Sequence, residues 1–66
     1  MNIQLLRGAI ISRFDSQKVF AEKIQWPENK LSRMMQKKYV PDIHEVAIIA
    51  GELHLSDEMF RQIFLS

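Results

Sequence analysis

The sequence predicts an all-α protein built as one compact bundle of five short helices. Its apolar residues recur at intervals of three and four positions, which is the spacing of a helix face, and they nowhere alternate for long as a strand requires. Only two glycines and two prolines interrupt the 66 residues, and 47% of the residues are hydrophobic. A chain of this length can form one small core but not two, so we expect a single domain spanning residues 1–66.

Capping residues predict where the helices begin. The expected helices start near residues 2, 17, 27, 43 and 57, and the first, second and fifth end near residues 13, 24 and 64. Ser16 and Ser56 are suitable N-caps. Proline is tolerated in a first helical turn, as at Pro27, because its missing N–H would have no partner there. The stretch from Asp42 to Glu45 has the form of a capping box, with a glutamate three residues after an acidic N-cap.

Each expected helix carries an apolar stripe that should face the core. In chain order, we expect the inward residues to be Ile3, Leu6, Ile10, Phe14, Phe20, Ala21, Ile24, Leu31, Met34, Met35, Ile43, Val46, Ala47, Ala50, Leu53, Phe60 and Phe64.

The charge of the chain is unevenly distributed along it. The net charge is +1, but residues 1–41 carry eight Lys and Arg against three acidic residues, whereas residues 42–66 carry one Arg against five. A basic N-terminal part and an acidic C-terminal part indicate one face for a polyanion and another kept away from it.

Several classes of function are disfavoured by composition. There is no cysteine, which excludes disulfides and thiol catalysis and fits a cytoplasmic protein; the family resemblance given below implies that it is bacterial or phage-encoded. The longest apolar run, 46–50, is too short to span a membrane, and no signal peptide pattern is present. His44 and His54 lack metal-ligand spacing, and no carboxylates are paired with a nucleophile. We therefore expect no catalytic residues, no metal, no cofactor and no small-molecule ligand.

A very short turn separates the second and third expected helices. Such a turn between two short helices is typical of a helix-turn-helix. From Leu6 to Phe60 the chain also carries a spaced set of residues: Ser16-Gln17, Phe20-Ala21, Leu31-Ser32-Arg33, Pro41, Ile43, Ile49-Ala50, Leu53 and Ser56. With this spacing it resembles, without a gap, the Cro and phage-repressor family of DNA-binding domains (lambda repressor-like, XRE-type).

The resemblance implies a sequence-specific transcriptional regulator, of the Cro repressor type, that binds a palindromic operator in double-stranded DNA as a homodimer. The helix from residue 27 would enter the major groove. Arg33 can pair with guanine, Asn29 with adenine, and Glu28 can accept from cytosine. The residues that we expect to contact bases are Glu28, Asn29, Ser32 and Arg33. Those that we expect to contact the DNA backbone are Gln17, Lys18, Lys30, Lys37, Lys38 and Tyr39.

The chain departs from the family at a few positions. Gln25, Lys37 and His54 stand where relatives often carry glycine at a helix end or turn. If the backbone is left-handed there, each substitution costs on the order of 1 kcal/mol. Pro27 replaces the usual serine or threonine cap, so the third helix should lack a capping oxygen.

Surplus apolar residues indicate a partner surface. Ile48 and Met59 occupy positions that are usually polar in the family, and such surface often marks an interface. We expect a homodimer interface made by Ile48, Met59, Ile63, Phe64 and Leu65. The alternative is that the same fold binds another protein, such as a phage repressor or a toxin, and acts as an antirepressor or antitoxin. The near-zero net charge and the proline and glutamate that open the third helix favour that alternative.

Overall fold

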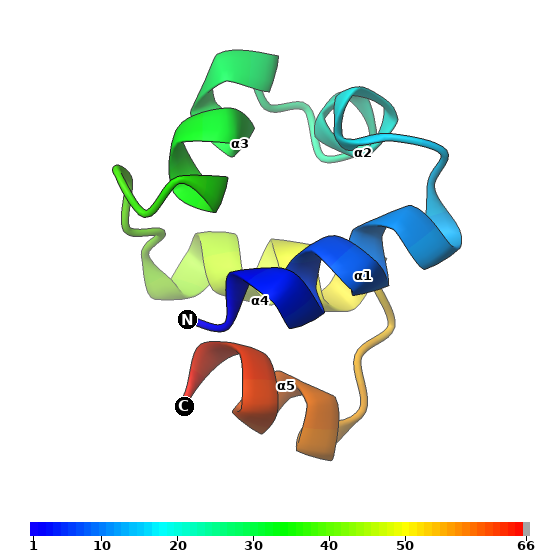
Figure 1. Cartoon of the computed structure of the whole chain (residues 1–66), viewed down its shortest axis with the longest axis vertical. Coiled ribbons are helices and arrows are strands. Elements are labelled where there is room, and N and C mark those ends of the chain that lie inside the picture. Colours follow the sequence, from blue (N-terminus) through cyan, green and yellow to red (C-terminus); the bar gives the residue numbers. More distant parts are fainter. Residues whose placement is uncertain (66) are drawn as a thin grey trace.

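The five predicted helices are present in the computed structural model, which describes residues 1–65 and contains no strand in that range. They are α1 (Ile3–Arg13), α2 (Gln17–Lys23), α3 (Glu28–Met35), α4 (Ile43–Glu52) and α5 (Asp57–Phe64). Helices α2 and α3 lie at one end of the molecule and α5 at the other, with α1 and α4 between them (Figure 1). The two ends of the chain meet, since the Asn2 N–H donates to the Ile63 carbonyl at 2.7 Å. None of these helices is long and apolar enough to cross a membrane.

Side-chain caps begin four of the five helices. The hydroxyls of Ser16 and Ser56 accept from the backbone N–H three residues later, as predicted, and Asn2 does the same for α1. The predicted capping box of α4 is complete, because Asp42 accepts from the Glu45 N–H at 2.8 Å and Glu45 accepts from the Asp42 N–H at 2.9 Å. Each cap satisfies a backbone donor that the helix itself leaves without a partner.

Helices α2, α3 and α4 all end in the same left-handed turn. Gln25, Lys37 and His54 have φ angles of 62°, 61° and 51°. In each turn the left-handed residue donates its N–H three residues back and its successor donates five residues back, which is the Schellman pattern. After α2, for example, the Trp26 N–H donates to the Ala21 carbonyl at 2.9 Å. The backbone is therefore left-handed at all three positions where relatives often carry glycine, although none of the three residues is glycine.

The core confirms the predicted inward faces of α2 and α3. For α1 it confirms only the central residues of the predicted face, Leu6 and Ile10. The fully or almost fully buried residues of the core are Leu6, Ile10, Phe20, Ala21, Ile24, Leu31, Met34, Met35, Ile49, Leu53 and Ile63. The predicted face of α4 was wrong in part, because Ile43 is 80% exposed, Ala47 is exposed, and Ile49 is buried instead. This helix is apolar around most of its circumference, so its sequence period could not select one face.

We predict that Gln25→Gly stabilises the protein by about 1 kcal/mol, because glycine removes the steric cost of a left-handed backbone. Gln25 is exposed, so little packing is lost with its side chain. His54→Gly should act in the same direction. Urea unfolding followed by circular dichroism gives the free energies, with Gln25→Ala as the control that keeps the cost. Equal stability of the Gly and Ala variants would contradict the strain.

Candidate nucleic-acid interface

The α2–α3 unit has the form of a helix-turn-helix. The two helices pack against each other, and the Schellman turn at Gln25 connects them. Pro27 precedes α3 with an extended φ and ψ of −59° and 141° and makes no side-chain cap hydrogen bond, as predicted. Leu31, Met34 and Met35 attach α3 to the core. The opposite side of α3 is thereby left facing solvent.

The four predicted base-contacting residues lie on that outward side of α3 or at its edge. Glu28, Asn29 and Arg33 are exposed. Ser32 is half-buried, and its hydroxyl accepts from the Gln36 side-chain amide at 3.3 Å. Asn29 and Arg33 are one turn apart, so both amide and guanidinium groups can reach the same surface.

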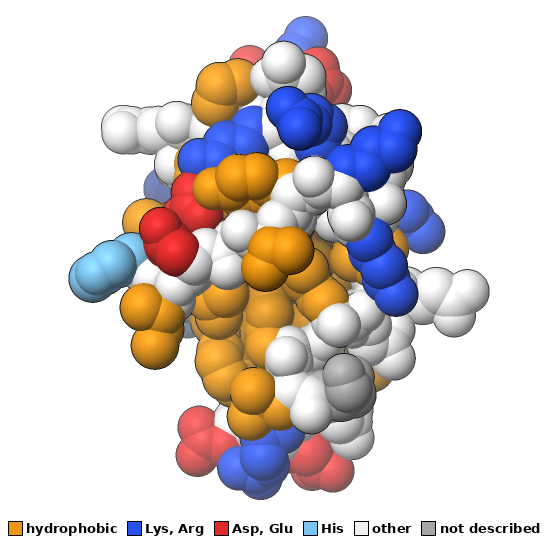
Figure 2. Space-filling model, turned by 90° about the vertical axis from the view of Figure 1, so that its left-hand side faces the viewer, with side chains coloured by type: hydrophobic (Ala, Val, Ile, Leu, Met, Phe, Trp, Pro, Cys, Tyr) orange, Lys and Arg blue, Asp and Glu red, His pale blue; other side chains and the backbone are white. Residues whose placement is uncertain are grey.

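The predicted backbone-contacting residues fall into two groups. Lys18, Lys37 and Lys38 are exposed, and Gln17 is half-buried at the start of α2. Several Lys and Arg side chains gather on the upper part of one face, above a hydrophobic band (Figure 2). Lys30 and Tyr39 form the second group, because their polar atoms are already bonded within the chain.

Lys30 and Tyr39 converge on the carboxylate of Glu45. The Lys30 Nζ lies 2.6 Å from Glu45 Oε2, and the Tyr39 hydroxyl lies 2.7 Å from Oε1 and 2.9 Å from Oε2. The same Nζ lies 4.3 Å from the centre of the Trp26 ring and 5.2 Å from that of Tyr39. The two aromatic rings meet edge to face with their centroids 6.2 Å apart. We call these four residues, Trp26, Lys30, Tyr39 and Glu45, the Glu45 cluster.

The Glu45 cluster shifts the protonation equilibria of its members. Hydrogen bonds from Lys30, from the Asp42 backbone N–H and from Tyr39 lower the pKa of Glu45 from 4.5 to about 2. The hydrogen bond to Glu45 raises the pKa of Lys30 and that of Tyr39 above their ordinary values. All three shifts favour the same state, a carboxylate paired with an ammonium and a neutral phenol.

A surface depression of about 250 Å³ lies where the Glu45 cluster meets α3. It is lined by Asn29, Lys30, Arg33 and Tyr39. Two predicted base-contacting residues and two members of the Glu45 cluster therefore line the same depression.

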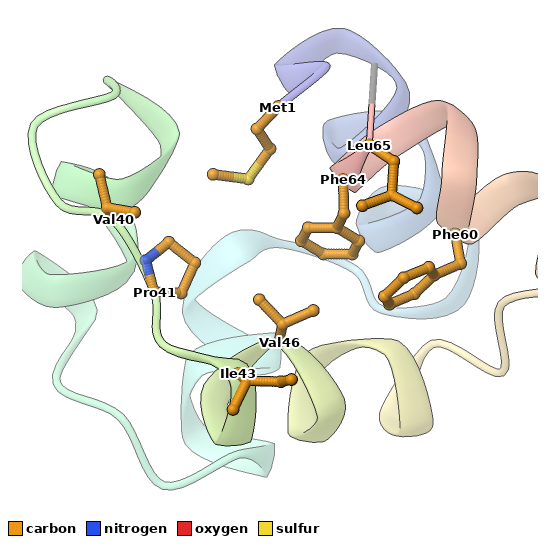
Figure 3. A pocket seen from close by; sticks show the side chains of 8 residues that line it. All are labelled: Met1, Val40, Pro41, Ile43, Val46, Phe60, Phe64 and Leu65. Atoms are coloured by element: carbon orange, nitrogen blue, oxygen red, sulfur yellow. The ribbon is translucent and has the colours of Figure 1, made fainter.

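A second hollow, of about 470 Å³, is apolar and lies between α4 and α5. The side chains that line it come from the connection before α4, from α4 itself, from α5 and from the chain start (Figure 3). We call it the apolar groove, and it is lined by Met1, Val40, Pro41, Ile43, Val46, Phe60, Phe64 and Leu65. Val40 and Ile43 are 83% and 80% exposed, which is unusual for large aliphatic side chains.

The structure does not bring the five predicted interface residues together. Phe64 and Leu65 line the apolar groove. Ile63 is fully buried, so its placement on a surface is corrected: it belongs to the core. Ile48 is exposed but two residues from Val46, which turns it to another side of α4, and Met59 packs against the core.

Sequence reasoning missed Glu45 as a member of a site. Its carboxylate was fully explained as part of a capping box, which gave no reason to seek two further partners. The spacing of Trp26 and Lys30, four residues apart at a helix start, was a weak signal for the cation–π contact. The apolar groove was missed because Val40, Pro41 and Ile43 come from a turn and a helix start, where periodicity carries no information.

Comparison with protein-family models, curated proteins and solved structures found no match to this chain. Within residues 1–65, no group of three or more His, Asp or Glu side chains could hold a metal ion.

We predict that Glu45→Gln flattens the acid limb of the stability curve. The pKa of Glu45 is lower in the folded chain than its ordinary 4.5, so its contribution is complete above pH 4.5 and is lost as the pH falls towards about 2. The midpoint of urea unfolding should therefore fall less steeply over this range in the variant, which should also be less stable at pH 7. Glu22→Gln, at an exposed position of α2, is the control and should keep the wild-type slope. Identical slopes for Glu45→Gln and wild type would show that the carboxylate is not paired in solution.

Proposed function

We propose that this chain is a sequence-specific regulator of transcription that binds double-stranded DNA with α3 in the major groove. The observation that carries the proposal is a short, firmly packed α3 whose outward side presents exposed Asn29 and Arg33, with exposed Glu28 as its first residue. The α2–α3 packing and the tight turn between them support it, because this arrangement lets a second helix project into a groove.

Sequence readout is assigned to the N-terminal two turns of α3. Arg33 would pair with guanine through two hydrogen bonds, Asn29 with adenine, and Glu28 would accept from the cytosine amino group. Ser32, whose hydroxyl is engaged only by a long hydrogen bond from Gln36, would add a weaker base contact. Register and affinity would come from Gln17, Lys18, Lys37 and Lys38, which flank this region and can reach phosphates.

A second copy of the chain is the proposed occupant of the apolar groove. Eight residues of α3 extend only about 12 Å, so one copy reads a few base pairs, too few to define an operator in a genome. Two copies related by a two-fold axis would read both halves of a palindrome, with their α3 helices about 34 Å apart. The groove suits this role because it lies beside the basic upper part of the same face (Figure 2).

The proposed activity is that of a Cro-like repressor in the cytoplasm of a bacterium or of a phage-infected cell. Such a protein would occupy its operator and exclude polymerase. Occupancy would be set by protein concentration and by competition with other repressors.

The alternative is a helix-turn-helix module that binds another protein, such as a phage repressor or a toxin. Two observations favour it: the exposed apolar groove, and the pairing of Lys30 with Glu45, which removes one cation from the candidate DNA surface. In that case a protein would fill the groove and no DNA sequence would be selected.

Selection from a random duplex library at two salt concentrations tests the proposal, and we expect a palindrome to be enriched. On that palindrome, Arg33→Ala should cost about 1–3 kcal/mol and relax the preference at one base pair in each half-site. Lys38→Ala should weaken all sequences alike and lower the salt slope by about one, because it removes a phosphate contact.

The matched pair separates readout from electrostatics, since both residues are exposed cations near α3. The absence of an enriched motif at either salt would refute DNA readout and leave the protein-binding alternative. Uniform weakening by Arg33→Ala would move Arg33 to the phosphate-contacting group.

We predict that Val40→Asp abolishes dimer formation and lowers operator affinity, because both copies would bury a carboxylate in the apolar groove. Val40 is 83% exposed, so the fold of the monomer should tolerate the change. Ile11→Asp, at a 50% exposed position of α1 outside the groove, is the control and should leave the dimer intact. Sedimentation at high micromolar concentration gives the masses, and a wild-type monomer there, even with DNA, would refute the dimer.

A further inference from the structure

The Glu45 cluster links three parts of the chain that surround the proposed DNA surface. Lys30 belongs to α3, Tyr39 to the connection after it, and Glu45 to the first turn of α4. The Glu45 carboxylate receives Lys30, the Tyr39 hydroxyl and the Asp42 N–H at 2.6 to 2.9 Å, so its two oxygens are fully engaged. Its side chain is only 14% exposed, against 33% for Lys30. The Glu45 cluster thus forms a partly buried polar link between α3 and α4, and we call this link the clasp.

We propose that Lys30 is a positioning residue, which sets the orientation of α3 through Glu45 and does not itself bind a DNA phosphate. This inference rests on the proposed DNA-binding function. It revises the assignment of Lys30 to the phosphate-contacting group, and it adds Tyr39 and Glu45 to the residues on which readout depends.

Two electrostatic interactions hold the Lys30 ammonium beside Glu45. On one side it meets a carboxylate, and on another the face of the Trp26 ring at 4.3 Å. Moving the ammonium to a phosphate would break both contacts. It would also leave the negative charge of Glu45 without its cation, close to a negatively charged duplex. Because the pair is neutral as a whole, it should release no counterion when DNA binds.

The clasp acts on readout through the depression in front of it. Lys30 and Tyr39 line that depression together with Asn29 and Arg33. Loosening the clasp should let α3 and the Arg33 side chain take several orientations. The expected loss is therefore in discrimination between operator and random DNA, because misdirected hydrogen bonds no longer favour the correct base.

The test compares Lys30→Met, the double variant Lys30→Met/Glu45→Gln, Tyr39→Phe and Lys38→Ala. Affinities for the selected palindrome and for random duplex are measured over a series of salt concentrations, well below the unfolding midpoint of each protein. For Lys30→Met we expect an unchanged salt slope and a specificity ratio lower by about tenfold. The double variant also lacks the contact between Lys30 and Glu45, so its ratio should stay below that of the wild type, and its difference from Lys30→Met measures the effect of the unpaired carboxylate. Lys38→Ala should lower the slope by about one and keep the ratio.

Tyr39→Phe removes only the hydroxyl that binds Glu45, so it supplies the same comparison if Lys30→Met does not fold. An unchanged slope with a lowered ratio in the folded variants supports the inference. A slope lowered by about one in the double variant would overturn it, since Lys30 would then contact a phosphate. An unchanged ratio in both Lys30→Met and Tyr39→Phe would overturn it as well. Failure of the wild-type protein to bind any duplex would refute the proposed function itself, which separates the two failures.

Discussion

The arrangement of α3 and α4 depends on the hydrogen bonds and the ion pair that the Glu45 carboxylate accepts. This carboxylate completes the capping box that starts α4, and it also holds Lys30 and Tyr39, so helix initiation and helix–helix orientation share one group. The seven residues that connect α3 to α4 carry few buried side chains of their own. The clasp supplies a polar substitute for that missing packing. A carboxylate with this many donors remains ionised at any pH near neutrality, as the lowered pKa of about 2 requires.

Local sequence rules predicted the helices well, because their start and stop signals lie within a few residues of each other. Ser16, Asp42 and Ser56 cap helices as their side-chain oxygens dictate. The left-handed positions were suspected only because a resemblance pointed to glycine there. The inward face of α4 was harder, since Ile43, Val46 and Ile49 all offer apolar surface and only the tertiary arrangement decides which is buried.

The exposed residues of the candidate site could be predicted from the sequence, but the contacts between residues far apart in the chain could not. Helical spacing places Asn29 and Arg33 opposite buried Leu31, so their exposure followed from the period of the helix, whereas Glu28 is exposed as the first residue of α3. The partner of Lys30 is fifteen residues away in the chain, and no local pattern encodes a contact of that range. The apolar groove likewise combines the two ends of the chain with a turn, and its lining emerges only when the helices are packed. The two surfaces are therefore tertiary properties built on helices that the sequence specifies locally.

The pairing of Lys30 changes how charge is distributed along α3, and this bears on Glu28. With Lys30 neutralised, the exposed cations of this region are Arg33, Lys37 and Lys38, all towards the C-terminal end of the helix. Glu28 stands alone at the other end, in the first turn of a helix whose N-cap is a proline without a capping oxygen. A carboxylate there interacts favourably with the positive end of the helix dipole and so compensates for the missing cap. Glu28 thus has a structural reason to be where it is, and base readout is an additional role that its exposure permits. The two roles are compatible, because a carboxylate that stabilises the first turn from solvent still presents an oxygen to a cytosine amino group.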